Sequence, residues 1–162
     1  MRMGKLSGIR VVDLSLFLPG PMLTLMMADQ GAQVTKVEPP TGDPARTMEP
    51  MEGGESVWFN NLNRGKDCRR LDLKTDEGQA ALWLLIDDAD VLVEGFRPGV
   101  MARLGFDYSA VAARNPGIVY CSVSAFGQTG AMALHPAHDL AVQAHAGFVS
   151  VNDARDGIPV VP

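Results

Sequence analysis

The sequence predicts an α/β protein with an open parallel sheet and flanking helices. A strand, a helix and a second strand follow one another within about thirty residues, which is the pattern of a right-handed parallel βαβ unit. Strand-like and helical stretches then continue to alternate along the chain. The length of 162 residues suits one domain with a real core and is too short for two.

The first βαβ unit lies near the N-terminus. Residues 9–15, IRVVDLS, are short, apolar and β-branched, and they are expected to form the first strand. Residues 21–31, PMLTLMMADQG, are expected to form a helix with Pro21 in its first turn and Gly31 just past its end. Residues 32–40, AQVTKVEPP, are expected to form the second strand.

Residues 39–56 are rich in proline, glycine and acidic side chains, so they are expected to form a long loop. The alternation then resumes. We expect strands at 68–74, 89–96 and 118–127, and the final stretch RDGIPVVP at 155–162 is also apolar and strand-like. We expect helices at 75–88, 97–105 and 107–117. Thr75 is the expected N-cap of the first of these helices, Pro98 lies in the first turn of the second, and Asn115 closes the third.

The composition is typical of a soluble globular protein. Hydrophobic residues make up 46% and charged residues 20%, and the formal charge of -5 argues against a nucleic-acid partner, because phosphate binding needs a cationic face. Asp13 interrupts the N-terminal apolar run before a signal peptide or membrane span is complete. Cys68 and Cys121 lie in predicted strands, which suits buried thiols in a reducing compartment. We therefore expect a cytoplasmic protein that binds neither nucleic acid nor membrane.

Three stretches are candidates for anion binding. Residues 18–24, LPGPMLT, lack the third glycine of a GxGxxG motif, and they are either an anion site at a helix N-terminus or a tight turn. Residues 63–70, NRGKDCRR, suit either a phosphorylated ligand or a solvated strand edge. Arg97 and Arg103 follow the carboxyl end of a strand, where open α/β sheets bind ligands, so we assign them to binding.

His138 and Asp139 stand side by side at a predicted helix start. Neighbouring helical residues point about 100° apart, so the pair cannot aim at one atom, and a helix-start aspartate beside an incidental histidine is favoured. The acidic residues of 39–56 have no histidine or cysteine at ligand spacing, so no metal is expected. Nothing in the local sequence activates Cys121, which is expected to be structural.

Six segments, in order along almost the whole chain, carry a family resemblance. They are LSGIRVVDLS, GPMLTLMMADQGAQVTKVEPPTGDPAR, NRGKDCRRLDLKTDEGQAAL, ADVLVEGFRPGVMARLG, NPGIVYCSVSAFGQTG and HPAHDLAVQAHAG. Together they resemble the family III CoA-transferases of the CaiB/BaiF type. This group includes formyl-CoA transferase, carnitine CoA-transferase and alpha-methylacyl-CoA racemase.

The resemblance implies a Rossmann-like large domain, a smaller domain, and a homodimer whose subunits are threaded through each other as interlocked rings. Full members are more than twice as long, so residues 1–162 are expected to be the N-terminal part of the CoA-binding large domain, inactive without the absent remainder. Coenzyme A is implied as a substrate, with no other cofactor. The implied CoA contacts are Leu18, Pro19, Leu71, Asp72, Leu73, Lys74, Gly95, Phe96, Arg97, Arg103, Pro136, Ala137, His138 and Asp139.

The resemblance also implies the chemistry. CoA moves from an acyl-CoA thioester to a free carboxylic acid through an aspartyl intermediate, whose nucleophilic aspartate is expected after Pro162. The alternatives are an alpha-methylacyl-CoA racemase, with His138 as a base, and a non-catalytic CoA-binding fragment. Formyl-CoA transferase has glutamine and arginine where this chain has Leu18 and Pro39, which disfavours formyl or oxalyl specificity. Arg46 is then the alternative phosphate anchor.

Overall fold

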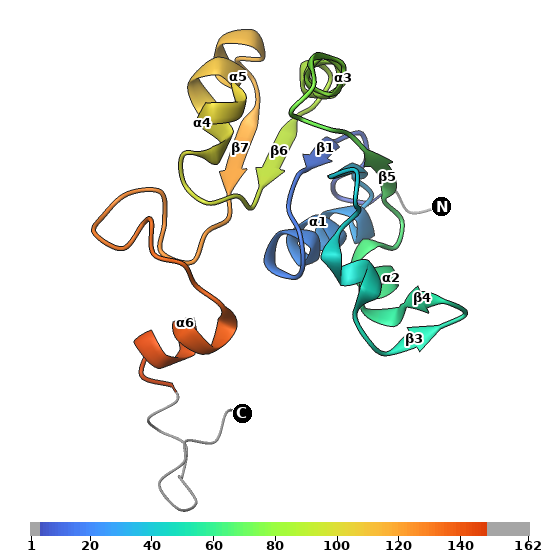
Figure 1. Ribbon diagram of the computed structural model, residues 1–162. Coiled ribbons are helices and arrows are strands. Elements are labelled where there is room, and N and C mark those ends of the chain that lie inside the picture. Colours follow the sequence, from blue (N-terminus) through green and yellow to red (C-terminus); the bar gives the residue numbers. More distant parts are fainter. Residues whose placement is uncertain (1–3, 149–162) are drawn as a thin grey trace, which may run out of the picture. The chain divides into compact units, whose positions relative to one another are not determined.

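The computed structural model describes residues 4–148 (Figure 1). The chain divides into two compact units, residues 1–124 and 125–162. The first unit contains the sheet, and the described part of the second contains the helix α6 (Asp139–His145). The strand expected at 155–162 lies outside the described residues. Among residues 4–148, no helix has both the length and the apolar character needed to cross a membrane.

The first unit is built on a five-stranded parallel sheet. The strands are β1 (Arg10–Asp13), β2 (Gln33–Glu38), β5 (Asp67–Arg70), β6 (Val91–Glu94) and β7 (Val119–Ser122). Their order in the sheet is β5-β2-β1-β6-β7, with every pairing parallel. The chain therefore builds outward from β1 in one direction and returns to build from β6 in the other, which is the Rossmann strand order. This confirms the predicted fold class and places the switch point between β1 and β6.

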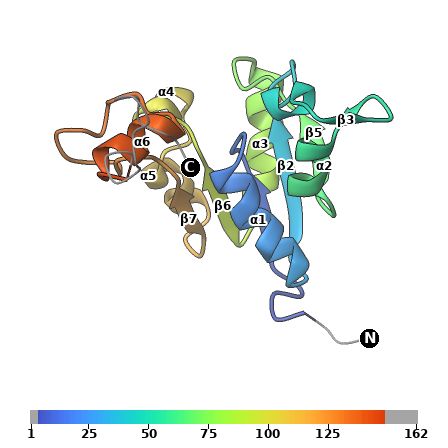
Figure 2. The ribbon, with the colours of Figure 1, turned by 90° about the horizontal axis from the view of Figure 1, so that it is seen from below.

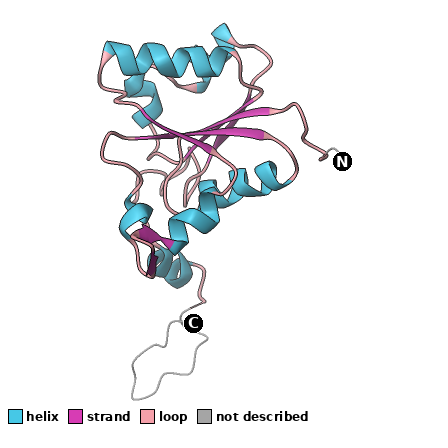
Figure 3. Cartoon of the chain, turned by 90° about the vertical axis from the view of Figure 1, so that its right-hand side faces the viewer, coloured by secondary structure: helices cyan, strands magenta, loops and turns pink. Residues whose placement is uncertain are grey.

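Helices cover both faces of the sheet (Figure 3). The helix α1 (Pro19–Asp29) packs through Met27 and Ala28 on the face that carries Val11, Val34 and Val93. The opposite face packs against α3 (Asp76–Asp87), α4 (Val100–Leu104) and α5 (Tyr108–Arg114). Because successive strand residues point to opposite faces, Val11 and Val12 serve different clusters.

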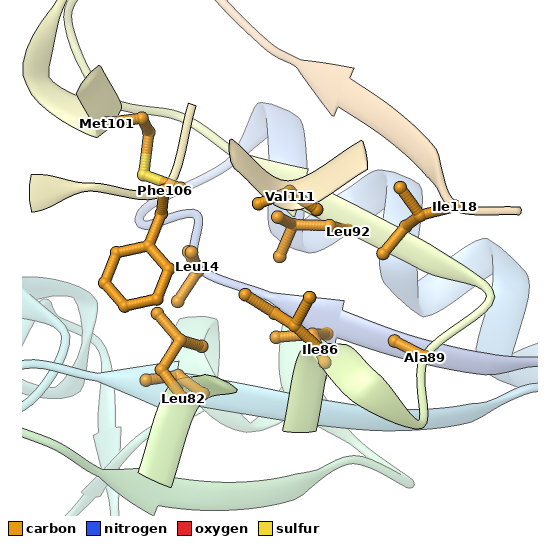
Figure 4. Close-up of a cluster of buried hydrophobic side chains, with 11 residues drawn as sticks. Leu14, Leu82, Ile86, Ala89, Leu92, Met101, Phe106, Val111 and Ile118 are labelled. Carbon is orange, nitrogen blue, oxygen red and sulfur yellow. The ribbon is translucent and has the colours of Figure 1, made fainter. Parts of the chain in front are cut away.

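The larger hydrophobic cluster lies between the sheet and α3, α4 and α5 (Figure 4). Leu82 and Ile86, one turn apart on α3, are fully buried and meet Val12 and Leu92 of the strands. Trp83 lies against Phe106 with the ring centroids 4.7 Å apart. Thr75 caps α3 by accepting a hydrogen bond from the amide of Gly78 at 3.1 Å, as predicted.

The region between β2 and β5 is more structured than predicted. It contains a 3-10 helix η1 (Pro44–Thr47), a hairpin of β3 (Met51–Glu52) and β4 (Glu55–Ser56), and the helix α2 (Val57–Asn63), which lies beside the hairpin in Figures 1 and 2. The prediction of a plain loop at 39–56 was wrong because short-range hydrogen bonds order it: Asp43 caps η1 and Ser56 caps α2.

Three smaller predictions need correction. Pro98 precedes α4, whose N-cap is Gly99 at φ 83°, a left-handed conformation that favours glycine. The strand expected at 68–74 ends at Arg70, which leaves residues 71–74 as a loop. Cys68 is exposed because β5 is an edge strand of the described sheet, and Cys121 is only partly buried, so neither is the buried thiol expected. Both thiols are free.

Two of the three leucines of α3, Leu82 and Leu84, differ in burial, so their substitution is expected to change stability by different amounts. Leu82 is 0% exposed and Leu84 is 69% exposed, so Leu82→Ala leaves a cavity whereas Leu84→Ala changes only surface. We expect Leu82→Ala to lower the free energy of unfolding by about 3 kcal/mol and Leu84→Ala by less than about 0.5 kcal/mol. Urea unfolding followed by circular dichroism measures both, and equal losses would contradict the position of α3 in the core.

Candidate functional site

A cavity of about 480 Å³ opens at the carboxyl ends of the strands. It is lined by Leu14 and Leu16 after β1, by the last two residues of β2 and the three that follow it (residues 37–41), by residues 71–74 after β5, and by Phe96, Val100 and Leu104 after β6. This is the end of an open α/β sheet at which ligands bind. The volume falls within the range of small-molecule sites.

The lining of the cavity is mainly apolar. Leu14, Val37, Leu71, Phe96 and Val100 supply hydrocarbon and aromatic surface. Four polar residues complete the lining: Glu38, Thr41, Asp72 and Lys74. An apolar chamber with a few polar groups suits a flat ring that carries hydrogen-bonding atoms on its edge.

The loop after β5 is held rigidly against α3. The Oδ1 atom of Asp72 accepts a hydrogen bond from the amide of Lys74 at 3.0 Å, and the Asp72 carbonyl accepts one from the amide of Thr75 at 3.1 Å. A side chain at Gly78 would overlap the Asp72 carbonyl, so only glycine lets α3 approach this closely. The loop thus presents Leu71, Leu73 and Lys74 to the cavity in a fixed arrangement.

The connection after β6 brings two arginines close to the same cavity. The buried carboxylate of Glu94 accepts a hydrogen bond from the amide of Phe96 at 2.8 Å, which sets the direction of the chain as it leaves the strand. The Arg103 guanidinium lies alongside Gly99, and both Arg97 and Arg103 are exposed. Within residues 4–148, neither arginine makes an ion pair, and neither does Lys74.

The turn between β1 and α1 borders the cavity through Leu16. Phe17 is the single described non-glycine residue with positive φ, at 61°, and Leu18 is the N-cap of α1 without a side-chain cap. Phe17 and Leu18 are 47% and 41% exposed. A left-handed aromatic residue is strained, and such strain persists only where the surroundings impose it.

Arg46, the alternative phosphate anchor, is paired with Glu38, which leaves it less available to a phosphate. Its Nε and Nη2 atoms donate to the two carboxylate oxygens of Glu38, each at 2.7 Å, and its guanidinium lies 3.8 Å from the centre of the Phe59 ring. Burial raises the pKa of Glu38, but the hydrogen bonds from Arg46 and from the Asp43 amide outweigh burial and hold that pKa below its ordinary value of 4.5.

Most of the basic stretch at 63–70 is structural. Arg64 pairs with Asp29 at 2.6 Å, and Arg69 pairs with Asp67 at 2.8 Å. The Lys66 side chain is 0% exposed. Arg64 and Arg69 therefore fit the interpretation of this stretch as a solvated strand edge. Of the basic residues in the stretch, Arg70 alone remains available to a phosphate, because it makes no ion pair within residues 4–148.

The structure brings together part of the predicted CoA-contact set. Leu71, Asp72, Leu73, Lys74 and Phe96 line the cavity. Five others lie between the strands β1 and β6 and the helices that follow them, or in those helices, and do not line the cavity themselves: Leu18, Pro19, Gly95, Arg97 and Arg103. Sequence reasoning missed several lining residues that lie at the ends of the strands or follow them, namely Leu14, Leu16, Val37, Thr41, Val100 and Leu104. The rule that ligands gather at carboxyl ends could have found them.

The remaining predicted contacts, residues 136–139, belong to the second unit. His138 is the N-cap of α6, although its side chain makes no capping hydrogen bond, and Asp139 is the first helical residue. The Oδ2 atom of Asp139 accepts a hydrogen bond from Gln143 at 2.7 Å. The predicted helix start is confirmed. Within residues 4–148 no group of three histidine, cysteine or acidic residues has the arrangement of a metal site.

Comparison with known proteins decides the family. Residues 6–162 match the profile of the family described as "CoA-transferase family III". The chain belongs to CoA-transferase family III. The fold agrees: Rv3272 from Mycobacterium tuberculosis, solved as a single-residue variant, superimposes with a TM-score of 0.93 at 34% identity, covering 100% of this chain and 44% of that one.

Two relatives of this family III chain are named for their reactions. The acetyl-CoA:oxalate CoA-transferase of Acetobacter aceti is 47% identical over 158 residues, which are 96% of this chain and 40% of that protein. The succinate–glutarate CoA-transferase of Agrobacterium fabrum is 40% identical over 163 residues, which are 96% of this chain and 41% of that protein. The chain thus spans about two fifths of the length of these relatives.

The Glu38 carboxylate predicts a dependence of stability on pH. Its pKa is lower in the folded protein, so the stabilisation it provides is present above the unfolded pKa and is lost as the pH falls through the folded pKa. We expect Glu38→Gln to be less stable than the wild type at pH 7 and to lose less stability than the wild type between pH 5 and pH 3, within about the range where glutamate titrates.

The matched control is Glu52→Gln, since Glu52 is exposed on the β3–β4 hairpin. Urea unfolding at a series of pH values gives the slope of the free energy of unfolding against pH for the wild type and the two variants. If the stability of Glu38→Gln depends on pH as steeply as that of the wild type, the ion pair with Arg46 does not set the pKa of Glu38.

Proposed function

We propose that this chain is the CoA-binding part of a family III CoA-transferase that moves CoA between an acyl-CoA thioester and a free carboxylic acid. The observation that carries the proposal is the apolar cavity at the switch point, lined by residues 71–74 and Phe96 and bordered by unpaired cations. The relatives reported above are named as CoA-transferases of carboxylic acids, which supports the same reaction.

The cavity fits the adenine end of CoA by its chemistry. Adenine has apolar faces and hydrogen-bonding edges, which match apolar side chains such as Leu71 and Phe96 and polar groups such as Thr41 and Asp72. CoA also carries a diphosphate and a 3′-phosphate. Lys74, Arg97 and Arg103 lie on the connections around the cavity and make no ion pair within residues 4–148, so their donors are available to phosphate oxygens.

The chemistry of the proposed reaction needs a nucleophile that we expect after Pro162. An aspartate attacks the thioester carbonyl, the CoA thiolate leaves, and a mixed anhydride forms. The thiolate then attacks the aspartyl carbonyl, which releases the first carboxylate and leaves an aspartyl-CoA thioester. The acceptor carboxylate repeats these two steps in reverse, so CoA is transferred and the aspartate is regenerated. In this scheme the described residues bind and orient CoA.

Leu18 and Pro39 disfavour a formyl or oxalyl group, whereas the Acetobacter aceti relative at 47% identity is named for oxalate, so the acid is identified only as a carboxylate. The homodimer that the family resemblance implies, and the cytoplasmic location expected from the cysteines, stay predictions. The racemase alternative requires His138 to act as a base, and the named relatives do not favour it. A non-catalytic fragment is likewise not favoured.

Arg97 and Arg103 give the first test of the proposal. In the protein at its full natural length, we expect Arg97→Ala and Arg103→Ala each to raise the KM for acyl-CoA about tenfold, because a charge-assisted hydrogen bond is worth about 1.5–3 kcal/mol. The kcat is expected to change less, since phosphate contacts are equal in ground state and transition state.

The control is Arg10→Ala. Arg10 begins β1 at the opposite end of the sheet and pairs with Asp88 at 3.4 Å. Steady-state kinetics with a series of acyl-CoA thioesters measure all three variants. An unchanged KM for both cavity variants, in folded protein, would argue against CoA phosphates at this edge.

His138 separates a transferase from a racemase. In deuterium oxide, we expect the full-length protein to transfer CoA to an added acid without exchanging the α-proton of a 2-methylacyl-CoA, and His138→Ala to keep most of this transfer. Mass spectrometry of the thioester measures the exchange. His145→Ala, at the last residue of the same helix, is the control. Exchange by the wild type that disappears in His138→Ala alone would establish the racemase reaction instead.

A further inference from the structure

The turn between β1 and α1 is closed at its base by two buried lysines. The Lys36 Nζ atom, from β2, donates to the Ser15 carbonyl at 2.7 Å. The Lys66 Nζ atom, from the connection between α2 and β5, donates to the Pro21 carbonyl at 2.8 Å. These two carbonyls flank the turn, one before it and one after it. Both lysine side chains are 0% exposed.

Each lysine is held in place by its own carboxylate. Lys36 pairs with Asp43 at 3.0 Å, and Lys66 pairs with Asp13 at 3.3 Å while also donating to Asn63 at 3.0 Å. The second oxygen of Asp43 accepts from the amide of Phe17 at 3.4 Å, so one ion pair reaches the strained residue itself. Each ammonium group is therefore placed by an ion pair in addition to its hydrogen bond to a carbonyl beside the turn.

The base of the turn is also tightly packed. The hydroxyl of Ser15 donates to Asp13, and a side chain at Gly20 would overlap that hydroxyl. Residues 16–18 lie in the turn between them, with Phe17 and Leu18 exposed and Leu16 lining the cavity. The lysines hold the two ends of the turn, and in its middle the amide of the left-handed Phe17 is held by Asp43, the partner of Lys36.

Lysine is a costly choice for these two positions. Burial of an ammonium group carries a desolvation penalty that a hydrophobic side chain avoids, and replacing buried ion pairs with apolar residues is often neutral or stabilising. Burial also lowers the pKa of Lys66, an effect that the Asp13 carboxylate opposes. What a hydrophobic side chain cannot provide is a directed hydrogen bond to a carbonyl on each side of the turn.

We propose that Lys36 and Lys66 are positioning residues that clamp the turn at residues 16–18 in the conformation that receives the pantetheine arm of CoA. The inference rests on the proposed function. The nucleotide end of CoA fills the cavity as far as Leu16, and the arm continues over the apolar surface of Phe17 and Leu18. The clamp thus acts on the arm and leaves the nucleotide subsite, at residues 71–74, untouched.

Two ligands separate these regions: CoA, and adenosine 3′,5′-bisphosphate, which lacks the arm. We measure both dissociation constants by isothermal titration calorimetry on the protein at its full natural length. For Lys66→Met and for Lys36→Met, we expect the affinity for CoA to fall by about tenfold or more, because a displaced turn loses the contacts it positions. We expect the affinity for the bisphosphate to stay within about twofold, because that subsite centres on residues 71–74 and meets the turn only at Leu16.

A core variant, Ile86→Ala, controls for general destabilisation, because Ile86 is 0% exposed on α3 and does not line the cavity. Its ratio of CoA to bisphosphate affinity is expected to equal that of the wild type. Lys66→Arg keeps a charged donor and is expected to recover part of the lost ratio.

Either of two results would overturn the clamp. Methionine variants that keep the wild-type affinity ratio would show that the turn does not depend on the lysines. Methionine variants at both positions that lose the bisphosphate as well, or do not fold, would show that the lysines hold the whole domain. A wild-type protein that binds neither ligand would instead refute the proposed function, which is a separate outcome.

Discussion

The carboxylate of Asp13 is the point at which three parts of the first unit meet. It ends β1, is 0% exposed, and accepts hydrogen bonds from the amide and hydroxyl of Ser15, from the hydroxyl of Thr24 on α1, and from Lys66 before β5. A buried carboxylate is tolerated only when its lone pairs are occupied, and here both oxygens are. Removing a partner from such a group leaves an uncompensated charge, so the strand, the helix and the connection must keep their relative positions.

This constraint explains why the cavity forms where it does. With the end of β1 fixed, the parallel pairing to β2 and β6 sets the heights at which those strands end, and β5 and β7 follow through the same register. The chain leaves each of the four strands β1, β2, β5 and β6 at the same edge, and the first residues of each connection supply the apolar lining. The cavity is therefore a consequence of sheet geometry, whereas its selectivity depends on the side chains that follow the strands.

The sequence predicted the sheet well because its strands are short apolar runs separated by capped helices. Thr75 and Asn115 mark helix ends through local chemistry that a sequence displays directly. The hairpin and α2 were missed because Ser56 caps α2 and binds the carbonyl of Met48 within a stretch that has no apolar period. The signal there was a single capping serine, which propensity alone does not distinguish from a loop residue.

The interior charges could not be predicted from residue type. Lysine and glutamate are usually exposed, yet Lys36 and Glu38 are 0% and 1% exposed. Their partners are Asp43, the N-cap of η1, and Arg46 within η1, in a region that was expected to be irregular. Residues 71–74 of the candidate site were predicted in full, because they form one contiguous loop. Leu14 and Val100 were not, because their role depends on neighbours that are distant in the chain.

The cations of the first unit thus divide into two groups, and the division bears on function. Lys36, Lys66 and Arg46 are paired with carboxylates in the interior, so each has its charge compensated before any ligand arrives. Lys74, Arg97 and Arg103 stand at the cavity without such a partner within residues 4–148. A phosphate gains little from a cation already bound to a carboxylate, because the attraction to one charge offsets the repulsion from the other. Density of basic residues in the sequence is therefore a poor guide to an anion site in this fold, and the decisive property is which of them the fold leaves uncompensated at the carboxyl ends of the strands.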